Sequence, residues 1–492
     1  MSQQSKHAHE RAVVIGASMV GLAVARALSE RFREVVIVER DSLAGDLPAH
    51  RPGVPQSWHI HNLTLRGQRE LEELFPGFVE TAVNLGAMRI DHALDVVAFT
   101  THGWEELYES EFIALSATRV LLEFAERQRF RALVRNATLL ENTRVEDLIV
   151  ESHDDQPRAV GVLTNHREQR EIHADLVVDC SGRSSRWKER FTRRQIPLPR
   201  ETVVDSRCGY SSRFYRPRNP AEFSWKGMIV DVQFPHQPRW GVIVPLENND
   251  WVVTLGGFGG KYPPSDETGF LAFGKQLKTP LFNQALERAD PLTRVRTFRR
   301  LEMRWSHFER YAHPLKRFLA IGDSAWAYNP LYGQGMSIGV TCARILRDVL
   351  AESPELADLP ARFYPRATKF AFPPWEATAL MDMRWPTTTG KRPWHAGITL
   401  PLSELMLRTS QDDQTVSRTL LQGVHLLKSP YELVDAGMLA RMARYGWKRL
   451  TTPITIKHDL PIRPADSRSP EELAPVRRNR ASMEAGTREA AF

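Results

Sequence analysis

Cysteine is scarce in this 492-residue chain, which contains only Cys180, Cys208 and Cys342. Three thiols so far apart in the sequence exclude a disulfide framework and a structural zinc site, and such scarcity is typical of a reducing compartment. We interpret Cys180 and Cys342 as small buried apolar side chains.

Long apolar runs are also missing. No stretch approaches the roughly 20 apolar residues that span a bilayer, and the polar opening MSQQSKHAHE lacks the apolar core of a signal peptide. The sequence therefore predicts a cytoplasmic protein without a transmembrane segment. Hydrophobic residues still make up 42% of the chain, which is enough for a large core divided among about two or three domains.

Dense basic segments are absent as well. The 66 Lys and Arg residues outnumber the 59 Asp and Glu residues, which gives a net charge of +7. This excess is small for so long a chain, and it is not interleaved with aromatic residues as on a nucleic-acid-binding surface. We expect no nucleic-acid partner.

What the chain does contain is a strand–turn–helix–strand pattern between residues 11 and 41. The turn reads Gly16-Ala-Ser18-Met-Val-Gly21, so a serine replaces the middle glycine of the dinucleotide-binding motif G-x-G-x-x-G. Gly16 permits the tight turn, and Gly21 lets the helix lie close to the sheet. Ser18 is small enough for the backbone to approach a pyrophosphate at the helix N-terminus.

An acidic residue, Glu39, follows the second strand of this pattern. A carboxylate at this place can accept hydrogen bonds from both hydroxyls of an adenosine ribose, and it repels a 2′-phosphate. The unit is therefore predicted to hold FAD or NAD rather than NADP.

Two later apolar strands also lead into small-residue turns. Counted after the turn at Gly16, the second turn contains Asp179 and Gly182, and the third contains Gly322 and Asp323. The third turn continues into the glycine loop, which we define as residues 329–335, and then into an apolar helix. Free N–H groups and the dipole of that helix would point at whatever lies against the loop.

Apolar periodicity places further elements along the chain. Helices are predicted over residues 63–74, 116–131, 265–278, 338–350, 402–409, 414–427 and 430–444. Strands are predicted over residues 12–15, 35–38, 174–178, 228–234, 241–245, 251–255 and 318–321.

The three turns, in this order and at these distances, resemble the FAD-dependent monooxygenases of the p-hydroxybenzoate hydroxylase type. Within this type, the motifs of the chain are most similar to those of bacterial flavin hydroxylases and epoxidases that are related to squalene epoxidase. The resemblance covers about residues 11–376, and the strings GVPQSWHIH and GDSAWAYNPLYGQGMS carry most of it. It implies an α/β fold in which a Rossmann-like FAD-binding domain of the glutathione-reductase type is interleaved with a β-sheet substrate domain, followed by a C-terminal helical region.

The implied domains are discontinuous in sequence. Residues 1–80, 112–190 and 296–376 would form the FAD-binding domain, and residues 81–111 and 191–295 the substrate domain. Residues 377–462 are predicted to be helical, and residues 463–492, rich in Pro, Ala and charged residues, to form a flexible tail.

The resemblance also implies which residues contact FAD. Arg119 would reach the pyrophosphate or ribityl chain, the Val145 backbone would touch adenine, and Asp323 would bind the ribityl hydroxyls. The alternatives are an exposed helical arginine for Arg119 and a helix N-cap for Asp323. The complete predicted set is Gly16, Ser18, Gly21, Glu39, Arg40, Arg119, Val145, Gly182, Gly322, Asp323, Gly333, Gln334, Gly335 and Met336.

The implied reaction transfers one oxygen atom from O₂, through a flavin C4a-hydroperoxide, to a hydrophobic small molecule of polyketide, aromatic or terpenoid type. His59 and His61 are candidate acid–base catalysts, with loop histidines satisfied by backbone as the alternative. The pair lacks a third and a fourth ligand, so no metal site is predicted. Candidates for the substrate pocket are Arg51, Gln56, Trp58, Tyr210, Trp240 and Pro330.

The source of electrons is left open. Family members that bind NADH or NADPH directly usually carry an Asp-Gly pair in the second turn, but here Cys180 and Ser181 separate Asp179 from Gly182. NADH or NADPH therefore serves as donor either directly or through a separate flavin reductase. The oligomeric state is not predicted.

Three other activities remain as alternatives. An FAD-dependent reductase or dehydrogenase of a prenyl or polyketide substrate would use the same architecture, and so would a non-catalytic flavin-binding protein. The W-x-W-x-I-P signature of flavin-dependent halogenases would fall on residues 240–245, where valine replaces both the second tryptophan and the isoleucine. Halogenation is therefore less favoured. The C-terminal helices also permit a role at a membrane surface, although ordinary packing is the preferred interpretation.

Overall fold

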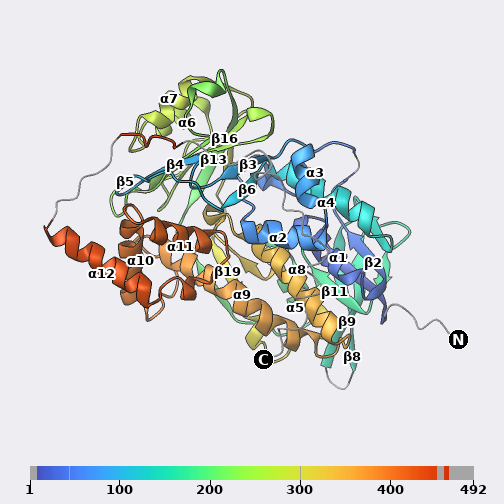
Figure 1. Ribbon diagram of the computed structural model, residues 1–492. Helices are drawn as coiled ribbons and strands as arrows, with labels where there is room; N and C mark the ends of the chain where they lie inside the picture. The colour runs from blue at the N-terminus through green and yellow to red at the C-terminus, as the bar shows by residue number, and fades with distance from the viewer. Residues whose placement is uncertain (1–7, 44, 154–155, 300, 452–458, 465–492) are drawn as a thin grey trace, which may run out of the picture.

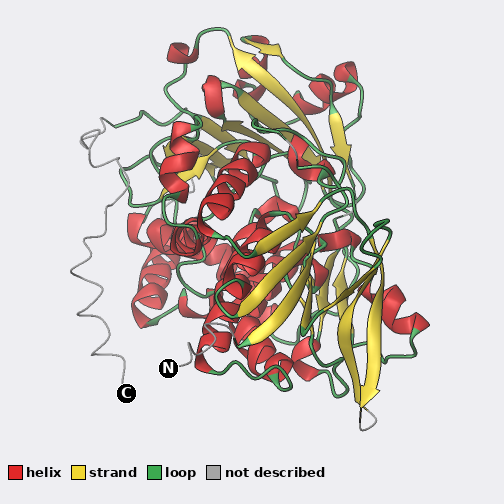
Figure 2. Ribbon diagram, turned by 90° about the vertical axis from the view of Figure 1, so that its right-hand side faces the viewer, coloured by secondary structure: helices red, strands yellow, loops and turns green. Residues whose placement is uncertain are grey.

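The computed structural model describes residues 8–43, 45–153, 156–299, 301–451 and 459–464. A parallel sheet and a larger, mostly antiparallel sheet form two separate groups of strands, and helices pack around them (Figures 1 and 2).

The parallel sheet has five strands in the order β20-β11-β1-β2-β7. It is built from β1 (His9–Ile15), β2 (Phe32–Val38), β7 (Ala137–Leu140), β11 (Leu176–Asp179) and β20 (Phe318–Ala320). The predicted strands at 12–15, 35–38, 174–178 and 318–321 are thus confirmed, although β11 begins two residues later than predicted and β20 ends one residue earlier. Because all pairings are parallel, the turns that follow β1, β11 and β20 meet at one edge of the sheet.

Helices α1 (Met19–Leu28) and α8 (Gly335–Glu352) pack side by side, and small residues make the close approach possible. A Cβ atom on Gly339 would lie 2.4 Å from Val20 Cγ2, and one on Gly322 would lie 3.2 Å from Val20 Cγ1. Val20 in the first turn of α1 therefore holds the start of α1 against both α8 and the third turn.

Helix α9 (Leu359–Asp382) follows α8 and contains three prolines, Pro365, Pro373 and Pro374. The sequence-based predictions do not include this helix. A proline inside a helix costs about 3 kcal/mol, but one row of residues at i, i+4 spacing is buried in the main core and stabilises the helix by tertiary packing. That row consists of Leu359, Phe363, Ala367, Ala371, Trp375 and Ala379.

The larger sheet has the order β17-β13-β16-β15-β14-β4-β5, with β18 also paired to β13. Its strands are β4 (Val96–Thr100), β5 (Gly103–Trp104), β13 (Gly209–Pro217), β14 (Gly227–Val230), β15 (Arg239–Pro245), β16 (Trp251–Gly257), β17 (Ala289–Pro291) and β18 (Arg296–Phe298). The predicted strands 241–245 and 251–255 are confirmed. The strand predicted over 228–234 ends at Val230. An isolated antiparallel β-bridge then pairs Gln233 with Gln237.

Alternate residues of this sheet face opposite sides. Val253 and Leu255 pack with Phe270 of α6 (Glu267–Gly274) and Phe282 of α7 (Leu281–Glu287), which cover one face at the top of Figure 1. The even-numbered neighbours face the other way, because side chains alternate along a strand. On the central strands this second face carries Tyr210, Ser212, Trp240, Val242, Thr254 and Gly256.

The other predicted helices occur with shifted ends. Residues 63–74 form α2 (Leu65–Leu74) and residues 116–131 form α4 (Arg119–Leu133), both capped by a threonine one residue before the helix. The remaining elements are α3 (Phe78–Asn84), α5 (Trp187–Arg193), β3 (Met88–Asp91), β6 (Ile113–Ser116), β8 (Val145–His153), β9 (Gln156–Thr164), β10 (Glu171–His173), β12 (Glu201–Val204), β19 (Met303–Ser306) and β21 (Trp326–Ala327).

The C-terminal region contains α10 (Ala396–Thr409), α11 (Gln414–Val424) and α12 (Ala436–Thr451). Residues 430–444 are not one helix, because a short 3₁₀ turn at Pro430–Glu432 is separated from α12. Within the described ranges no helix is long and apolar enough to cross a membrane. Of the predicted tail, residues 465–492 lie outside the described residues, and the domain boundaries stay a prediction.

Candidate functional site

The first turn, between β1 and α1, depends on two glycines. Gly16 has a φ of +97°, and a Cβ atom on Gly21 would lie 1.9 Å from the Gly16 carbonyl oxygen. Ser18 is the N-cap residue of α1, yet its side chain forms no capping hydrogen bond. The first N–H groups of α1 therefore lack the side-chain cap that α2 and α4 receive from Thr64 and Thr118.

Glu39 is buried beside this turn. Its carboxylate accepts hydrogen bonds from the Ala17 amide at 2.7 Å and the Asp41 amide at 3.0 Å, and its Oε1 atom lies 3.2 Å from Arg51 Nη1. Arg51 also pairs with Asp41 at 3.1 Å and donates from Nε to Glu123 at 3.0 Å. The structure thus places Arg51, a candidate for the substrate pocket, beside the first glycine turn.

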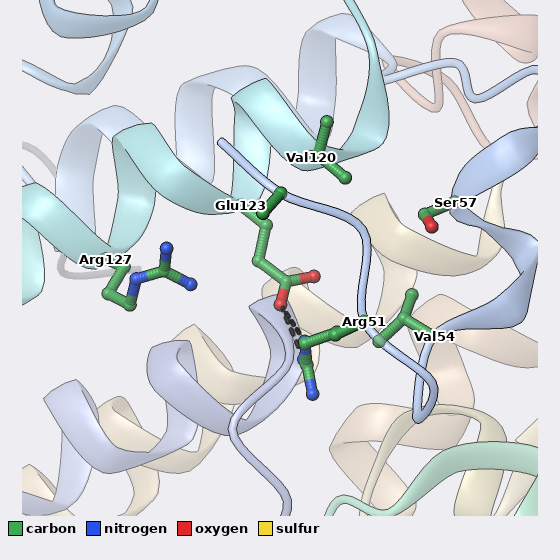
Figure 3. A pocket seen from close by; sticks show the side chains of 7 residues that line it. Arg51, Val54, Ser57, Val120, Glu123 and Arg127 are labelled. Carbon is green, nitrogen blue, oxygen red and sulfur yellow. Dashed lines mark hydrogen bonds and ion pairs between the residues drawn. The ribbon is translucent and has the colours of Figure 1, made fainter. Parts of the chain in front are cut away.

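A small pocket adjoins this ion cluster. Figure 3 shows Arg51 reaching toward Glu123 of α4, with Val54 and Ser57 on the segment that carries Arg51. The pocket is lined by Ala49, Arg51, Val54, Ser57, Val120, Glu123 and Arg127.

Asp323 lies in the third turn and faces two arginines. Arg183 Nε is 3.3 Å from the Asp323 carboxylate, and Arg119 is near enough to lower the pKa of this group. Burial nevertheless raises the pKa of Asp323, although 34% of its side chain is exposed. The N-cap alternative does not apply, because Asp323 lies inside a 3₁₀ turn and α8 begins only at Gly335.

Arg119 is the first residue of α4 and is only 6% exposed, so it is not a surface arginine. Its Nε atom lies 3.3 Å from Glu123, the residue that also binds Arg51. Arg119 and Arg51 are therefore linked through one carboxylate.

The glycine loop leads into the N-terminus of α8. Gly333 has a φ of +64°, and a Cβ atom there would lie 2.8 Å from Asn62 Cβ. A Cβ atom on Gly335 would lie 3.4 Å from Asp323 Oδ1, which places Asp323 beside the loop. Gln334 is the N-cap residue but gives no side-chain cap, and its buried Oε1 atom has no hydrogen-bond partner among the described residues. Met336 packs against the main core.

The second turn is bound to the third by hydrogen bonds. Gly182, with a φ of +71°, donates its N–H to Ser324 Oγ at 2.9 Å. The Asp179 carboxylate is fully buried and accepts hydrogen bonds from Ser181 Oγ at 2.5 Å and Ser324 Oγ at 3.2 Å. Asp179 thus joins the two turns.

Two predicted cofactor contacts have protein partners. The Val145 carbonyl accepts a hydrogen bond from Arg190 Nη2 at 2.7 Å. Arg40 is exposed and donates to the Gly53 carbonyl at 3.0 Å.

His59 and His61 have different neighbours. His59 Nδ1 lies 2.8 Å from Ser212 Oγ on β13, and its ring packs edge-on against Tyr210 at 4.9 Å. His61 Nδ1 lies 3.0 Å from the His59 carbonyl. Burial, with Arg296 as a second cause, lowers the pKa of His59 to about 4, and burial with Arg119 lowers the pKa of His61 to about 3. Both rings are therefore neutral at pH 7.

Metal binding finds no support in the part of the chain that is described. No three His, Cys, Asp or Glu side chains there are grouped to hold a metal ion.

An aromatic cluster lies on the second face of the larger sheet. Trp240 covers Gly256, where a Cβ atom would lie 2.1 Å from Trp240 Cζ2. The ring centres of Tyr210 and Trp240 are 6.2 Å apart. Trp385 stacks on Phe258 at 5.5 Å. The buried members are Cys208, Tyr210, Trp240, Phe258, Leu301 and Trp385, with Val232, Phe234, Val242, Phe298 and Leu331 packed against them.

The structure brings some predicted pocket residues to this cluster and not others. Tyr210 and Trp240 belong to it, and Pro330 precedes its member Leu331. Trp58 instead stacks on His50 with ring centres 3.4 Å apart, and Gln56, in the same 3₁₀ turn as Trp58, is half-buried.

Sequence reasoning missed several members, among them Phe258, Leu301 and Trp385. Period-two alternation explains Val242, but Trp385 follows the unpredicted helix α9 and carried no local signal.

Comparisons with known proteins bear on the fold. No protein-family model matches the chain. Protein Rv3254 of Mycobacterium tuberculosis is 29% identical over 449 residues, which are 88% of this chain and 93% of that protein.

Solved structures with a similar fold include the flavin-dependent brominase Bmp2, with a TM-score of 0.61 and 14% identity over 90% of this chain and 100% of that one. p-Nitrophenol 4-monooxygenase PnpA from Pseudomonas putida has a TM-score of 0.59 and 17% identity, covering 86% and 99% of the two chains. 2-Methyl-3-hydroxypyridine-5-carboxylic acid oxygenase has a TM-score of 0.55 and 18% identity, covering 76% and 90%. The chain therefore has the α/β fold of flavin-dependent oxygenases and of a flavin-dependent brominase.

Proposed function

We propose that this protein is an FAD-dependent monooxygenase that transfers one oxygen atom from O₂ to a hydrophobic small molecule. The observation that carries the proposal is the meeting of three glycine turns at one edge of the parallel sheet. The third turn continues into the glycine loop, whose residue Leu331 packs against the aromatic cluster. A cofactor held by the turns would therefore lie near the aromatic cluster.

The residues of the turns fit FAD. Two helix N-termini without side-chain caps, those of α1 and α8, offer N–H groups and positive dipole ends to a pyrophosphate and to a flavin ring. The buried Oε1 atom of Gln334 has no donor among the residues that the structure describes, and an unpaired buried acceptor costs about 1–3 kcal/mol. A cofactor N–H or O–H group would remove this cost.

The proposed contacts with FAD are distributed over the three turns and the residues beside them. Gly16, Ser18 and Gly21 would hold the pyrophosphate, with Glu39 at the adenosine ribose and Asp323 at the ribityl hydroxyls. Arg119 would add a cation at the pyrophosphate or the ribityl chain. The other proposed contacts are Arg40, Val145, Gly182, Gly322, Gly333, Gln334, Gly335 and Met336.

Reduced FAD, when bound, supplies activated oxygen. The chain itself binds and orients the substrate and excludes water, for which the uncharged aromatic cluster is suited. His59 is neutral and bound to Ser212 through Nδ1, which leaves Nε2 to hold or accept a proton from a substrate hydroxyl. The apolar character of this cluster favours a terpenoid, polyketide or aromatic compound as the substrate.

The test begins with the purified protein, which we expect to be yellow and to contain FAD. It would be reduced without oxygen by NADH, by NADPH or by a flavin reductase, and then mixed with labelled O₂ and a panel of hydrophobic compounds. Mass spectrometry should find one labelled oxygen atom in a product. Colourless protein that does not take up added FAD would contradict the proposal.

The same experiment separates the alternatives. A brominated product that requires bromide would identify a brominase, the activity named for the similar structure of Bmp2. A saturated product formed without O₂ would identify a reductase. Flavin that binds but is reduced by no donor would identify a non-catalytic binding protein.

A further inference from the structure

Asp382, the last residue of α9, is completely buried and accepts hydrogen bonds from two other segments of the chain. Asn329 Nδ2 donates to its two oxygens at 3.1 and 2.9 Å, and the Tyr332 hydroxyl donates to Oδ1 at 2.9 Å. Ser206 Oγ, on the connection between β12 and β13, donates to Oδ2 at 2.9 Å. One carboxylate thus joins the glycine loop, the larger sheet and α9.

Within the glycine loop, Asp382 holds both ends of a single turn. Asn329 precedes the 3₁₀ turn Pro330–Tyr332 and caps it, since its Oδ1 atom accepts a hydrogen bond from the Leu331 amide at 3.1 Å. The bonds from Nδ2 to Asp382 orient the Asn329 amide group for this cap. Directly after Tyr332 the chain passes through Gly333 to the N-terminus of α8.

The same three segments contribute side chains to the aromatic cluster. The glycine loop contributes Leu331, β13 with its preceding connection contributes Cys208 and Tyr210, and the chain after α9 contributes Trp385. The Thr388 hydroxyl donates to the Asp382 carbonyl at 2.6 Å, so Asp382 also holds the segment beyond Trp385. Any shift of Asp382 would therefore change the position of the loop relative to the cluster.

The charge of Asp382 is not matched by a cation. In the described part of the chain no Lys, Arg or His forms an ion pair with it, and burial raises the pKa of Asp382 to about 6, with Asp205 as a further cause. The other titratable groups around it are Tyr332 and Cys208, and burial raises both of their pKa values well above the ordinary ones. A buried carboxylate that is bound only by neutral donors lowers the stability of the fold. Its presence therefore indicates that the geometry it imposes is needed.

We propose that Asp382 is a positioning residue that fixes the glycine loop against the aromatic cluster, so that the bound flavin and the substrate meet in one geometry. This inference rests on the proposed function. Without the carboxylate the loop loses three of its hydrogen bonds, and oxygen transfer becomes less efficient. The two electrons of reduced flavin and two protons then convert O₂ to H₂O₂, and the substrate stays unchanged.

The test compares Asp382→Asn with the exchange variant Asn329→Asp/Asp382→Asn, using FAD-loaded protein. For each, the ratio of H₂O₂ to oxygenated product, the visible spectrum of the bound flavin and the FAD content are measured. We expect Asp382→Asn to keep its FAD, to shift the flavin spectrum and to raise the H₂O₂ ratio several-fold. The exchange variant restores an amide–carboxylate pair and should recover a large part of the coupling.

Thr378→Val is a matched control. Thr378 is buried one turn earlier on α9, and its hydroxyl bonds only within that helix. It should leave the H₂O₂ ratio and the flavin spectrum unchanged. If Asp382→Asn does not fold, Tyr332→Phe and the pH profile of the unaltered protein replace it, and the H₂O₂ ratio should then rise in Tyr332→Phe and as pH falls through about 6.

The outcomes separate the two claims. An unaltered protein that oxygenates its substrate, together with variants of equal coupling, overturns the role of Asp382 and leaves the proposed function intact. An unaltered protein that binds no FAD or oxygenates nothing overturns both.

Discussion

Arg51 Nη1 lies 3.2 Å from Glu39 Oε1, and the other oxygen of Glu39 accepts a hydrogen bond from the Ala17 amide in the first glycine turn. One carboxylate thus braces the turn and binds a cation that comes from a loop 12 residues farther along the chain. Arg51 is in turn shared with Asp41 and Glu123, so the first glycine turn is connected to α4 through buried charges.

Removing this cation should destabilise the protein. We expect Arg51→Gln to lower the free energy of unfolding by about 3 kcal/mol, because buried carboxylates would lose their shared partner. Urea unfolding followed by circular dichroism measures the change. Arg40→Gln is the control, since Arg40 is exposed and the expected change is within about 0.5 kcal/mol. Equal losses in both variants would show that Arg51 has no special role.

Asp323 should be needed to retain FAD. We expect Asp323→Ala to weaken FAD binding about 10- to 100-fold, the loss that corresponds to charged hydrogen bonds of about 1.5–3 kcal/mol. Quenching of flavin fluorescence during titration of the apoprotein measures the affinity. Asp290→Ala, on exposed β17 of the other sheet, should bind FAD like the unaltered protein. Full FAD occupancy in Asp323→Ala would contradict the assigned contact.

Two glycine-to-alanine variants should have opposite effects. Gly21→Ala places a Cβ atom 1.9 Å from the Gly16 carbonyl, so we expect a loss of at least about 3 kcal/mol in unfolding free energy. Gly397→Ala meets no atom within 4 Å in α10 and should stabilise the protein by up to about 1 kcal/mol. Thermal unfolding distinguishes the two. A Gly21→Ala protein of normal stability would mean that the helix can move away from the turn.

Acid should destabilise the protein through its buried histidines. Burial lowers the pKa of His59 to about 4 and that of His425 to about 2, whereas unfolded histidine titrates near 6.5. Between these values the unfolded state binds more protons, so the free energy of unfolding falls as pH decreases below 6.5. The raised pKa of Asp382 acts in the opposite sense.

His425→Asn tests this pH dependence. His425 Nδ1 accepts a hydrogen bond from the Leu65 amide, a role that an asparagine oxygen can take over. The slope of unfolding free energy against pH between about 4 and 6 should become shallower by up to about 1.4 kcal/mol per pH unit. Denaturant titrations at several pH values measure it, and an unchanged slope would show that His425 is already protonated in the folded protein.

The parallel sheet and its turns could be predicted because their signals are local. A short apolar run predicts a buried strand, and the glycine that follows it, Gly16 or Gly322, predicts a tight turn. The structure confirms both. Glu39 could likewise be predicted beside the first turn, since it follows a strand that pairs with β1.

The contacts that shape the candidate site were beyond sequence reasoning. Trp385 joins Tyr210 only because α9 runs through three prolines, and Asp382 meets Asn329 only at the end of that helix. Packing of a buried row of side chains outweighs the local cost of proline, and no pattern around residue 382 shows this.

The strand–turn–helix unit of dinucleotide-binding type, the two later glycine turns and the apolar character of the chain between them could be predicted from local patterns, since each depends on neighbouring residues. The contact of Arg51 with Glu39 beside the first turn, that of His59 with Ser212, and the three segments that Asp382 joins become visible only in the folded chain. These pairs lie up to 176 positions apart, and such contacts form only when the helices and both sheets are packed together.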